Sequence, residues 1–215
     1  MEWDKVLDNR KQTFVFDQEK IPTRKIIDQI IYEMHEKCPS KQKRVVYKLN
    51  IFDDNNVRQK LDLYSHTQRN PSSTLQRYNP QVIAPYLFVW SMRDKQEIDK
   101  NVSHIEDNNV LKVNDEYEDK EQLFIMANLE IGLSSMFVAL SASNQGLSTG
   151  FCKCINHTDL IHKKYVFKPI LMMGLGYASE DQKKYYCPIN QKLIRTPGDK
   201  WLTKPELDQY VHFSV

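Results

Sequence analysis

The sequence lacks the features that mark several classes of protein. Its 215 residues contain no internal repeat and no low-complexity tract, and opposite charges nearly cancel, leaving a formal net charge of +2. Such an even balance gives the chain no general electrostatic field toward nucleic acid or a membrane surface. Apolar residues make up 40% and charged residues 27%. This composition is typical of a globular protein, and the length suits one large domain or two small ones.

Signals for export and for membrane insertion are also lacking. The N-terminal stretch MEWDKVLDNRKQTF has no apolar core between a basic start and a small-residue cleavage site, so no export signal is predicted. No run of residues approaches the roughly 20 apolar residues that a membrane span needs. We therefore expect a soluble, cytoplasmic protein that has no membrane partner.

Cysteine is scarce, and its spacing does not favour a metal site. The chain has 4 cysteines, of which Cys152 and Cys154 form a C-x-C pair with His157 three residues later. Zinc sites usually bring a second closely spaced ligand pair, and the sequence offers none. We predict no metal site and, inside a cell, reduced thiols.

Apolar periodicity predicts helices alternating with strands. Helices are expected at 22–38, from 53 onward, at about 120–145 and at 157–167, and strands at 45–52, 86–92, 147–155 and 169–177. The charged stretch 93–119 reads as an exposed excursion or lid, and 178–215 as an extended C-terminal arm. This order predicts an α+β fold of mixed layers, in which helices cover a buried sheet.

The helix expected at 120–145 is unusual because it is apolar on almost every side. Leucine, isoleucine, methionine, phenylalanine and valine leave little polar surface between Leu123 and Leu140. A helix of this kind is buried, either in the middle of a domain or in a subunit interface.

Four separated stretches of the chain match the pattern of one protein family. NRKQTFVF (9–16) sits where that family has an arginine-rich segment before an amphipathic helix. CPSKQKRVVYKLNIF (38–52) resembles its Ala-Pro-Ser segment and the strand that follows. EIGLSSMFVALSASNQGLSTGFC (130–152) resembles its long dimer helix and Gly-Leu-Gly-Thr turn, and PILMMGLGY (169–177) a later strand. On these stretches the chain resembles the nitroreductase-like FMN flavoproteins.

The resemblance implies a fold and an activity. The fold would be a single nitroreductase-like domain spanning 1–215, with a mainly antiparallel sheet, a long buried dimer helix and an extended C-terminal arm. The protein would be a homodimer with FMN at the subunit interface. It would be an FMN-dependent oxidoreductase that reduces an electron-poor small molecule with electrons from NAD(P)H. No side chain is required as a catalytic acid or base, and no nucleic-acid partner is expected.

The resemblance also implies which residues bind the cofactor. Arg10 and Lys11 would meet the flavin phosphate, Pro39 and Ser40 would lie against the ring system, and the backbone of 150–153 would run beside the middle ring, with an N–H toward N5. The implied cofactor-binding residues are Arg10, Lys11, Gln12, Pro39, Ser40, Lys43, Gly150, Phe151, Cys152, Lys153, Arg195 and Lys204.

Departures from the family pattern leave two alternatives open. Phe14 stands where a second basic contact is common, Lys43 where asparagine is usual, and 45–47 reads Val-Val-Tyr in place of Gln-Pro-Trp. These changes favour a dimeric relative whose flavin site is repurposed or lost and which acts as a binding protein. The other alternative is a nucleic-acid binder that uses the basic run 41–44 with Tyr47, Arg10 and Lys11; the near-neutral net charge is evidence against it.

Overall fold

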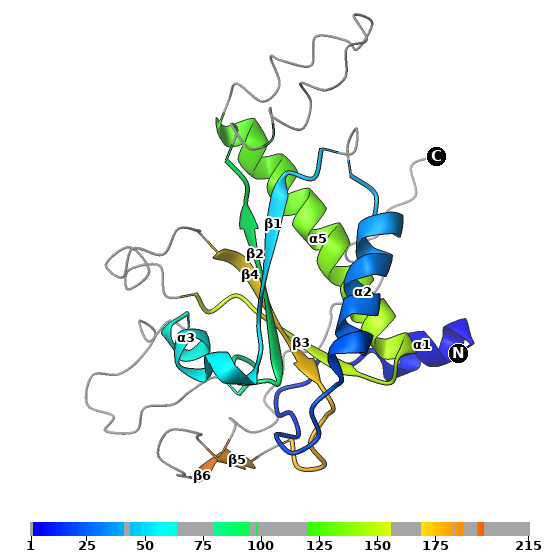
Figure 1. The fold of residues 1–215 in the computed structure, drawn as a ribbon, viewed down its shortest axis with the longest axis vertical. Helices are drawn as coiled ribbons and strands as arrows, with labels where there is room; N and C mark the ends of the chain where they lie inside the picture. Colours follow the sequence, from blue (N-terminus) through cyan, green and yellow to red (C-terminus); the bar gives the residue numbers. More distant parts are fainter. Residues whose placement is uncertain are drawn as a thin grey trace, which may run out of the picture.

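The fold is a central antiparallel sheet with helices on both faces. The computed structural model describes residues 2–40, 44–63, 80–94, 98, 120–155, 169–182, 184–186 and 193–195. Helices α2 (Arg24–Lys37) and α5 (Lys120–Asn144) cover one face of the sheet, and α3 (Val57–Asp62) lies against the other (Figure 1). The chain thus has the layered α+β plan that its order of helices and strands predicts.

The sheet is built from strands that are distant in sequence. Its order is β1-β2-β4-β3, with β1 at Tyr47–Phe52, β2 at Tyr86–Met92, β4 at Pro169–Gly176 and β3 at Ser148–Cys152. Every neighbouring pair is antiparallel. The expected strands are confirmed, although β1 starts two residues later and β3 spans only the middle of 147–155. The expectation of a mainly antiparallel sheet is confirmed as well.

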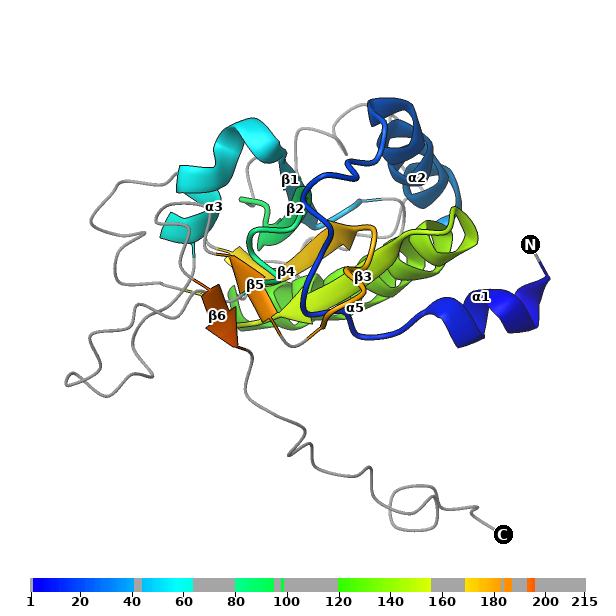
Figure 2. The same cartoon turned by 90° about the horizontal axis from the view of Figure 1, so that it is seen from below.

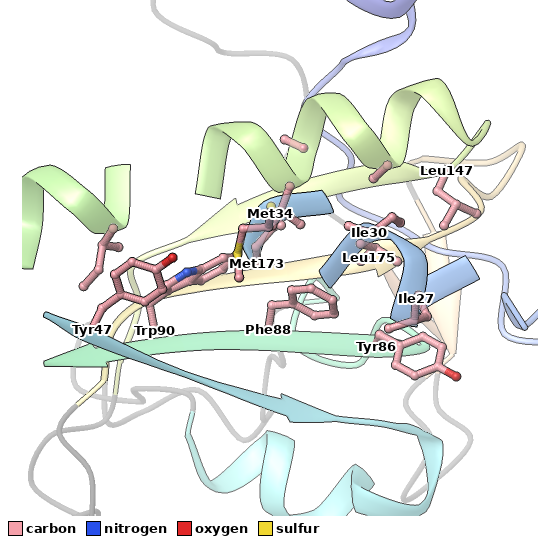
Figure 3. Close-up of a cluster of buried hydrophobic side chains, with 14 residues drawn as sticks. Ile27, Ile30, Met34, Tyr47, Tyr86, Phe88, Trp90, Leu147, Met173 and Leu175 are labelled. Carbon is pink, nitrogen blue, oxygen red and sulfur yellow. The ribbon is translucent and has the colours of Figure 1, made fainter. Parts of the chain in front are cut away.

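The buried central strand β2 divides the core into two layers. Phe88 and Trp90 point toward α2 and α5, where they pack with Met173 of β4 (Figure 3). Leu87 and Val89 point to the opposite face and join the apolar cluster under α3. Because successive side chains of a strand alternate between faces, a strand covered on both sides must be apolar throughout, as the run YLFVWSM is.

Helix α5 is apolar all round, but its sides have different surroundings. One side is buried against α2 and the sheet, through residues such as Ile131 and Val138. Another side leaves large apolar side chains 45–57% exposed: Phe124, Ile125, Leu129, Leu133 and Met136. We call these five residues the outer face of α5. By length and composition Glu121–Asn144 could cross a membrane, so the expectation that no such run exists is wrong. Its packing against α2 and the sheet is that of a core helix.

Some elements differ from the sequence-based expectation. Helix α1 (Trp3–Asn9) was not predicted, because it is only 7 residues long and buries a single side chain, Val6. The stretch 93–119 was expected to be exposed, yet Ile98 is buried against Val46 and Leu123. The rest of that stretch beyond Asp94 and the helix expected at 157–167 lie outside the described residues.

The C-terminal arm contains a small hairpin in its described part. Strands β5 (Lys184–Tyr186) and β6 (Leu193–Arg195) pair antiparallel, with Tyr185 opposite Ile194. The extended conformation expected for the arm is found at these residues, but their pairing was not predicted. Two strands this short do not form a core of their own.

Lys60 of α3 is a buried cation that ties this helix to the start of β2. None of its surface is exposed, and its Nζ donates hydrogen bonds to the carbonyl oxygens of Ala84 (2.8 Å) and Pro85 (3.1 Å). Asp54 lies 3.6 Å from the same nitrogen. Burial lowers the pKa of Lys60 from 10.5 to about 8, since the charged form is the one that loses hydration.

The lowered pKa of Lys60 predicts a pH-dependent stability. Between about pH 8 and 10.5 the unfolded chain holds a proton that the folded chain has released, so this group makes the protein more stable as pH rises. We expect the free energy of unfolding of the wild type, relative to Lys60→Met, to rise by about 3 kcal/mol across that window. Denaturant unfolding of both proteins over this pH range measures the difference between their free energies of unfolding. Because other groups titrate in both proteins, their contributions cancel in this difference. A difference that does not change with pH would contradict the assignment.

Candidate functional site

The N-terminal segment that carries the predicted phosphate contacts lies against the sheet. Its residues 12–17, which we call the seam, run past the ends of β3 and β4 (Figure 2). On one side, the Thr13 N–H donates to the Thr149 carbonyl oxygen at 2.9 Å. On the other, the Asp17 N–H donates to the Tyr177 carbonyl oxygen at 2.9 Å. The seam is therefore bonded both to β3 and to the residue that follows β4, although it lies more than 130 positions before them in the sequence.

Glutamine side chains supply hydrogen bonds that a regular strand pairing would otherwise provide. The amide of Gln12 accepts from the Phe151 N–H at 3.1 Å and donates to the Phe151 carbonyl at 2.8 Å, as a strand backbone would. Gln182 accepts from the N–H groups of Phe14 (3.1 Å) and Val15 (3.2 Å), and donates to the Val15 carbonyl at 2.7 Å. Together these amides fix the seam along much of its length.

Gly150 allows the seam to approach β3 so closely. A Cβ at this position would lie 2.0 Å from the Thr13 carbonyl oxygen and 2.8 Å from Nε2 of Gln81. Gln81 is itself buried, and the same Nε2 donates to the Thr13 carbonyl at 3.1 Å. Since the nearest obstacle is backbone, no side-chain rotation would make room for a methyl group.

The structure brings the first group of predicted site residues together here. Arg10 follows α1 directly, and its N–H donates to the Val6 carbonyl, which also accepts from Ser143 of α5 at 2.7 Å. Lys11 is exposed at the start of the seam, and Lys153 is exposed just beyond β3. Among the described residues, neither Arg10 nor Lys11 forms a salt bridge. The backbone thus brings Arg10 and Lys11 to within two residues of Gln12, which is bonded to Phe151 of β3.

A second group lies at the turn between α2 and β1. The Ser40 hydroxyl donates to Glu130 Oε1 at 2.9 Å and accepts from the Val45 N–H at 2.8 Å. The Val46 N–H donates to Glu130 Oε2 at 3.0 Å. Pro39 is exposed beside Ser40. We call Ser40 together with residues 44–46 the Ser40 turn.

The Ser40 turn is strained. Val45 has a φ of 49°, in the left-handed region, where a β-branched residue is a clear outlier. Such a conformation costs about 1–3 kcal/mol and persists only where the surroundings enforce it. Arg93 contributes to this, because its guanidinium donates to the carbonyl oxygens of Arg44 (3.2 Å) and Val45 (2.9 Å).

Within one chain the two groups lie far apart along α5. The Ser40 turn is bonded to Glu130, whereas α1 is bonded to Ser143. These helix positions differ by 143 − 130 = 13 residues, which corresponds to about 20 Å along the helix axis. Figure 1 shows the same separation, since the chain after α2 and the chain after α1 lie toward opposite ends of α5. One chain therefore does not gather all the predicted contacts at one place.

Other predicted residues fall outside these groups or have buried side chains. Lys43 and Lys204 lie outside the described residues, and for Arg195 only the backbone, in β6, is described. The side chain of Cys152 is 4% exposed and belongs to the core under α3, so only its backbone is at the strand edge. Tyr47, which a nucleic-acid surface would need for stacking, is buried in the core.

Sequence reasoning missed the residues that hold the site in place. Gln81, Gln182 and Glu130 stand in a loop, in the C-terminal arm and on an apolar helix, respectively. A polar residue at a helix position surrounded by apolar ones was the available signal for Glu130, because buried charges are rare unless they are paired. The two glutamines had no such signal, since their partners are backbone groups distant in sequence.

The close approach at Gly150 predicts a large effect of one methyl group. Gly150→Ala should lower the free energy of unfolding by about 3 kcal/mol, because the seam must move away from β3 and its hydrogen bonds must lengthen. Ser148→Ala, on the same strand, adds no atoms and should change it by less than about 0.5 kcal/mol. Denaturant unfolding compares the two variants, and equal stabilities would show that the seam does not depend on this contact.

Comparison with known proteins identifies the architecture. Neither a protein-family profile nor a curated protein sequence gives a significant match. A nitroreductase family protein from Streptococcus pneumoniae has a TM-score of 0.70 at 15% identity, covering 99% of this chain and 100% of that one. A protein of Exiguobacterium sibiricum described as a nitroreductase, solved in complex with FMN, has a TM-score of 0.68 at 15% identity, covering 100% and 98%.

A third structure extends this likeness. A Staphylococcus epidermidis protein described as an NAD(P)H:FMN oxidoreductase has a TM-score of 0.65 at 14% identity, covering 99% of this chain and 95% of that one. Identities this low define an architecture rather than an activity. Because the likeness extends over nearly the full length of each chain, the expected fold is confirmed, and the protein has the nitroreductase fold.

Proposed function

We propose that this protein is an FMN-dependent oxidoreductase that passes electrons from NAD(P)H to an electron-poor small molecule. The observation that carries the proposal is the seam, which holds Arg10 and Lys11 beside the strand edge 150–153 in a fold shared with a protein that binds FMN. The bound cofactor would supply the redox chemistry. The protein's part would be to bind, orient and shield it, and none of these tasks needs a catalytic acid or base.

Arg10 and Lys11 fit the phosphate end of FMN. Arg10 is half-buried and Lys11 is exposed, and neither has an acidic partner among the residues described above. A guanidinium presents several N–H donors in a fixed plane, which matches the oxygens of a phosphate. The anchoring of α1 to Ser143 would keep Arg10 in place before the cofactor arrives.

The strand edge fits the ring end. Backbone N–H groups alternate between the two edges of a strand, and on β3 Thr149 and Phe151 use the edge that faces the seam. Lys153 is next on that edge, and among the described residues nothing accepts a hydrogen bond from its N–H. We assign this N–H, rather than that of Phe151, which Gln12 occupies, as the donor toward the flavin N5.

A complete site would need a second copy of the chain. Helix α1, which precedes the seam, and the Ser40 turn are bonded to α5 at positions about 20 Å apart along the helix, which favours a site whose two halves come from different subunits. The outer face of α5 offers an apolar surface for such a pairing. Obligate interfaces are large and hydrophobic, as this helix side is. We therefore propose a homodimer, acting in the cytoplasm.

Specific contacts also favour the alternative of a repurposed site. The Gln12 amide is engaged with Phe151, and the only hydroxyl hydrogen of Ser40 is donated to Glu130. Both side chains were expected to meet the flavin directly. In the alternative, the dimeric scaffold is kept as a binding protein and FMN is not bound. An FMN titration separates the two proposals.

The phosphate assignment predicts the effect of removing Arg10. A charge-assisted phosphate contact contributes about 1.5–3 kcal/mol, so Arg10→Ala should weaken FMN binding by roughly ten- to a hundredfold. Quenching of FMN fluorescence measures the affinity. The matched control is Arg24→Ala, which removes an exposed arginine whose Nε lies 2.7 Å from Asp28 on α2, and which should bind as the wild type does. Equal affinities for all three proteins would refute the assignment of Arg10.

The dimer assignment predicts the effect of a charge on the outer face of α5. Leu129 is 57% exposed, and an arginine at this position would leave a cation in an apolar interface without a partner. We expect Leu129→Arg to weaken dimerisation by at least about a hundredfold. Sedimentation velocity measures the oligomeric state, with Ile21→Arg as a control that changes a comparably exposed apolar residue outside α5. A wild type that sediments as a monomer would contradict the proposal.

A further inference from the structure

Glu130 is a carboxylate that the fold keeps almost completely out of water. It lies on α5 with 2% of its surface exposed, close to the outer face of that helix. A buried carboxylate is unfavourable unless hydrogen bonds replace its hydration. Its oxygens accept from the Ser40 hydroxyl at 2.9 Å and from the Val46 N–H at 3.0 Å. One side chain therefore holds both ends of the segment that joins α2 to β1.

The segment that Glu130 holds is one that would not keep its shape alone. Val45, between the two attachment points, has a φ of 49°. Its N–H donates to the Ser40 hydroxyl at 2.8 Å, and that hydroxyl in turn donates to Glu130. The Arg93 guanidinium holds the Val45 carbonyl from the other side, at 2.9 Å. A strained residue fixed from several directions is typical of functional sites, where the backbone must be preorganised.

We propose that Glu130 is a positioning residue of the flavin site, which fixes the Ser40 turn in the conformation that presents Pro39 and Ser40 to the cofactor. The inference rests on the proposed function, because Pro39 and Ser40 are candidate flavin contacts only there. It also gives the Ser40 hydroxyl a different role, since its hydrogen is used to join the turn to Glu130.

General energetics favour this role over one in stability alone. Replacing buried ionic groups by apolar side chains of similar volume is often neutral or stabilising, so a buried carboxylate is poor evidence for stabilisation. What it does supply is directed acceptors, here for one hydroxyl and one backbone N–H. Those acceptors select one conformation of the turn against less strained ones.

The test begins with FMN affinity in Glu130→Gln. This variant keeps the size of the side chain but loses the charge and one acceptor, so the turn would spend less time in the binding conformation. If the competent fraction falls to about a tenth, the apparent affinity for FMN falls about tenfold. Ser40→Ala removes the hydroxyl group that donates to Glu130. Both substitutions act on the same hydrogen bond, between Ser40 and Glu130. The double variant should therefore lose about as much FMN affinity as the weaker-binding single variant, rather than the product of the two single losses.

A matched control is a second glutamate–serine pair that involves α5. Glu33 of α2 accepts a hydrogen bond from Ser141 of α5 at 2.5 Å, so Glu33→Gln alters a glutamate–serine pair that does not touch the Ser40 turn. We expect this variant to bind FMN as the wild type does. Circular dichroism and thermal unfolding of all variants verify that each is folded at the temperature of the titration.

The rate at which Cys38 is alkylated tests the same role without FMN. It ends α2 two residues before Ser40 and is half-buried, and burial together with the Glu130 charge raises the pKa of its thiol. Loosening of the turn should expose it, so Glu130→Gln and Ser40→Ala should both increase its alkylation by iodoacetamide severalfold. Removing the Glu130 charge would by itself lower the pKa of the Cys38 thiol and speed its alkylation. Ser40→Ala keeps that charge, so faster alkylation in this variant reports loosening of the turn alone. Peptide mass spectrometry gives the rate at Cys38 and, as an internal reference, at the exposed Cys154, which should not change.

The outcomes separate this inference from the proposed function. A drop in FMN affinity in Glu130→Gln, together with faster alkylation of Cys38 in both variants, supports the positioning role. Wild-type affinity and unchanged alkylation in these variants would overturn it, even if the wild type binds FMN. If the wild type binds no FMN, the proposed function fails, and with it the flavin-site role of Glu130; the Cys38 rates then decide only whether Glu130 holds the turn.

Discussion

The close contact between Gly150 and the Thr13 carbonyl is the constraint on which the candidate site depends. No other residue type leaves room for that oxygen, and the amides of Gln12, Gln81 and Gln182 then fix the seam in this position. The consequence is chemical as well as structural. Arg10 and Lys11 would otherwise be cations on a free segment after α1, and the seam directs that segment to a strand edge.

Helix α5 connects this seam to the second half of the site. It anchors α1 through Ser143 near its end and the Ser40 turn through Glu130 about 20 Å away. The same helix exposes its outer face, with Leu129 directly beside Glu130 in sequence. In the proposed homodimer, a second copy that pairs along that face supplies the Ser40 turn for each seam. Pairing of two subunits then explains why α5 is apolar on almost every side, why it carries a buried carboxylate and why the two groups of site residues are separated.

The sequence predicts the layers of this fold better than its contacts. Strand β2 and helices α2 and α5 follow from apolar patterns that depend only on local burial, and all three are found. Helix α1 is too short to show such a pattern. The resemblance to flavoproteins pointed to residues 9–16 and Ser40 as candidate contacts, but it did not predict that Gln12 and Ser40 bond to the protein itself. Those contacts join residues more than 80 positions apart, for which local patterns carry no information.

The most direct test of the account is what the protein carries when it is purified from cells. Absorbance spectroscopy and mass spectrometry of the denatured sample detect a flavin and identify it, and titration with FMN detects an empty site. The account predicts a flavin spectrum, or its appearance on adding FMN, with the mass of FMN released in stoichiometric amount. A colourless protein that takes up no added FMN would contradict the account and favour a scaffold that has lost its cofactor.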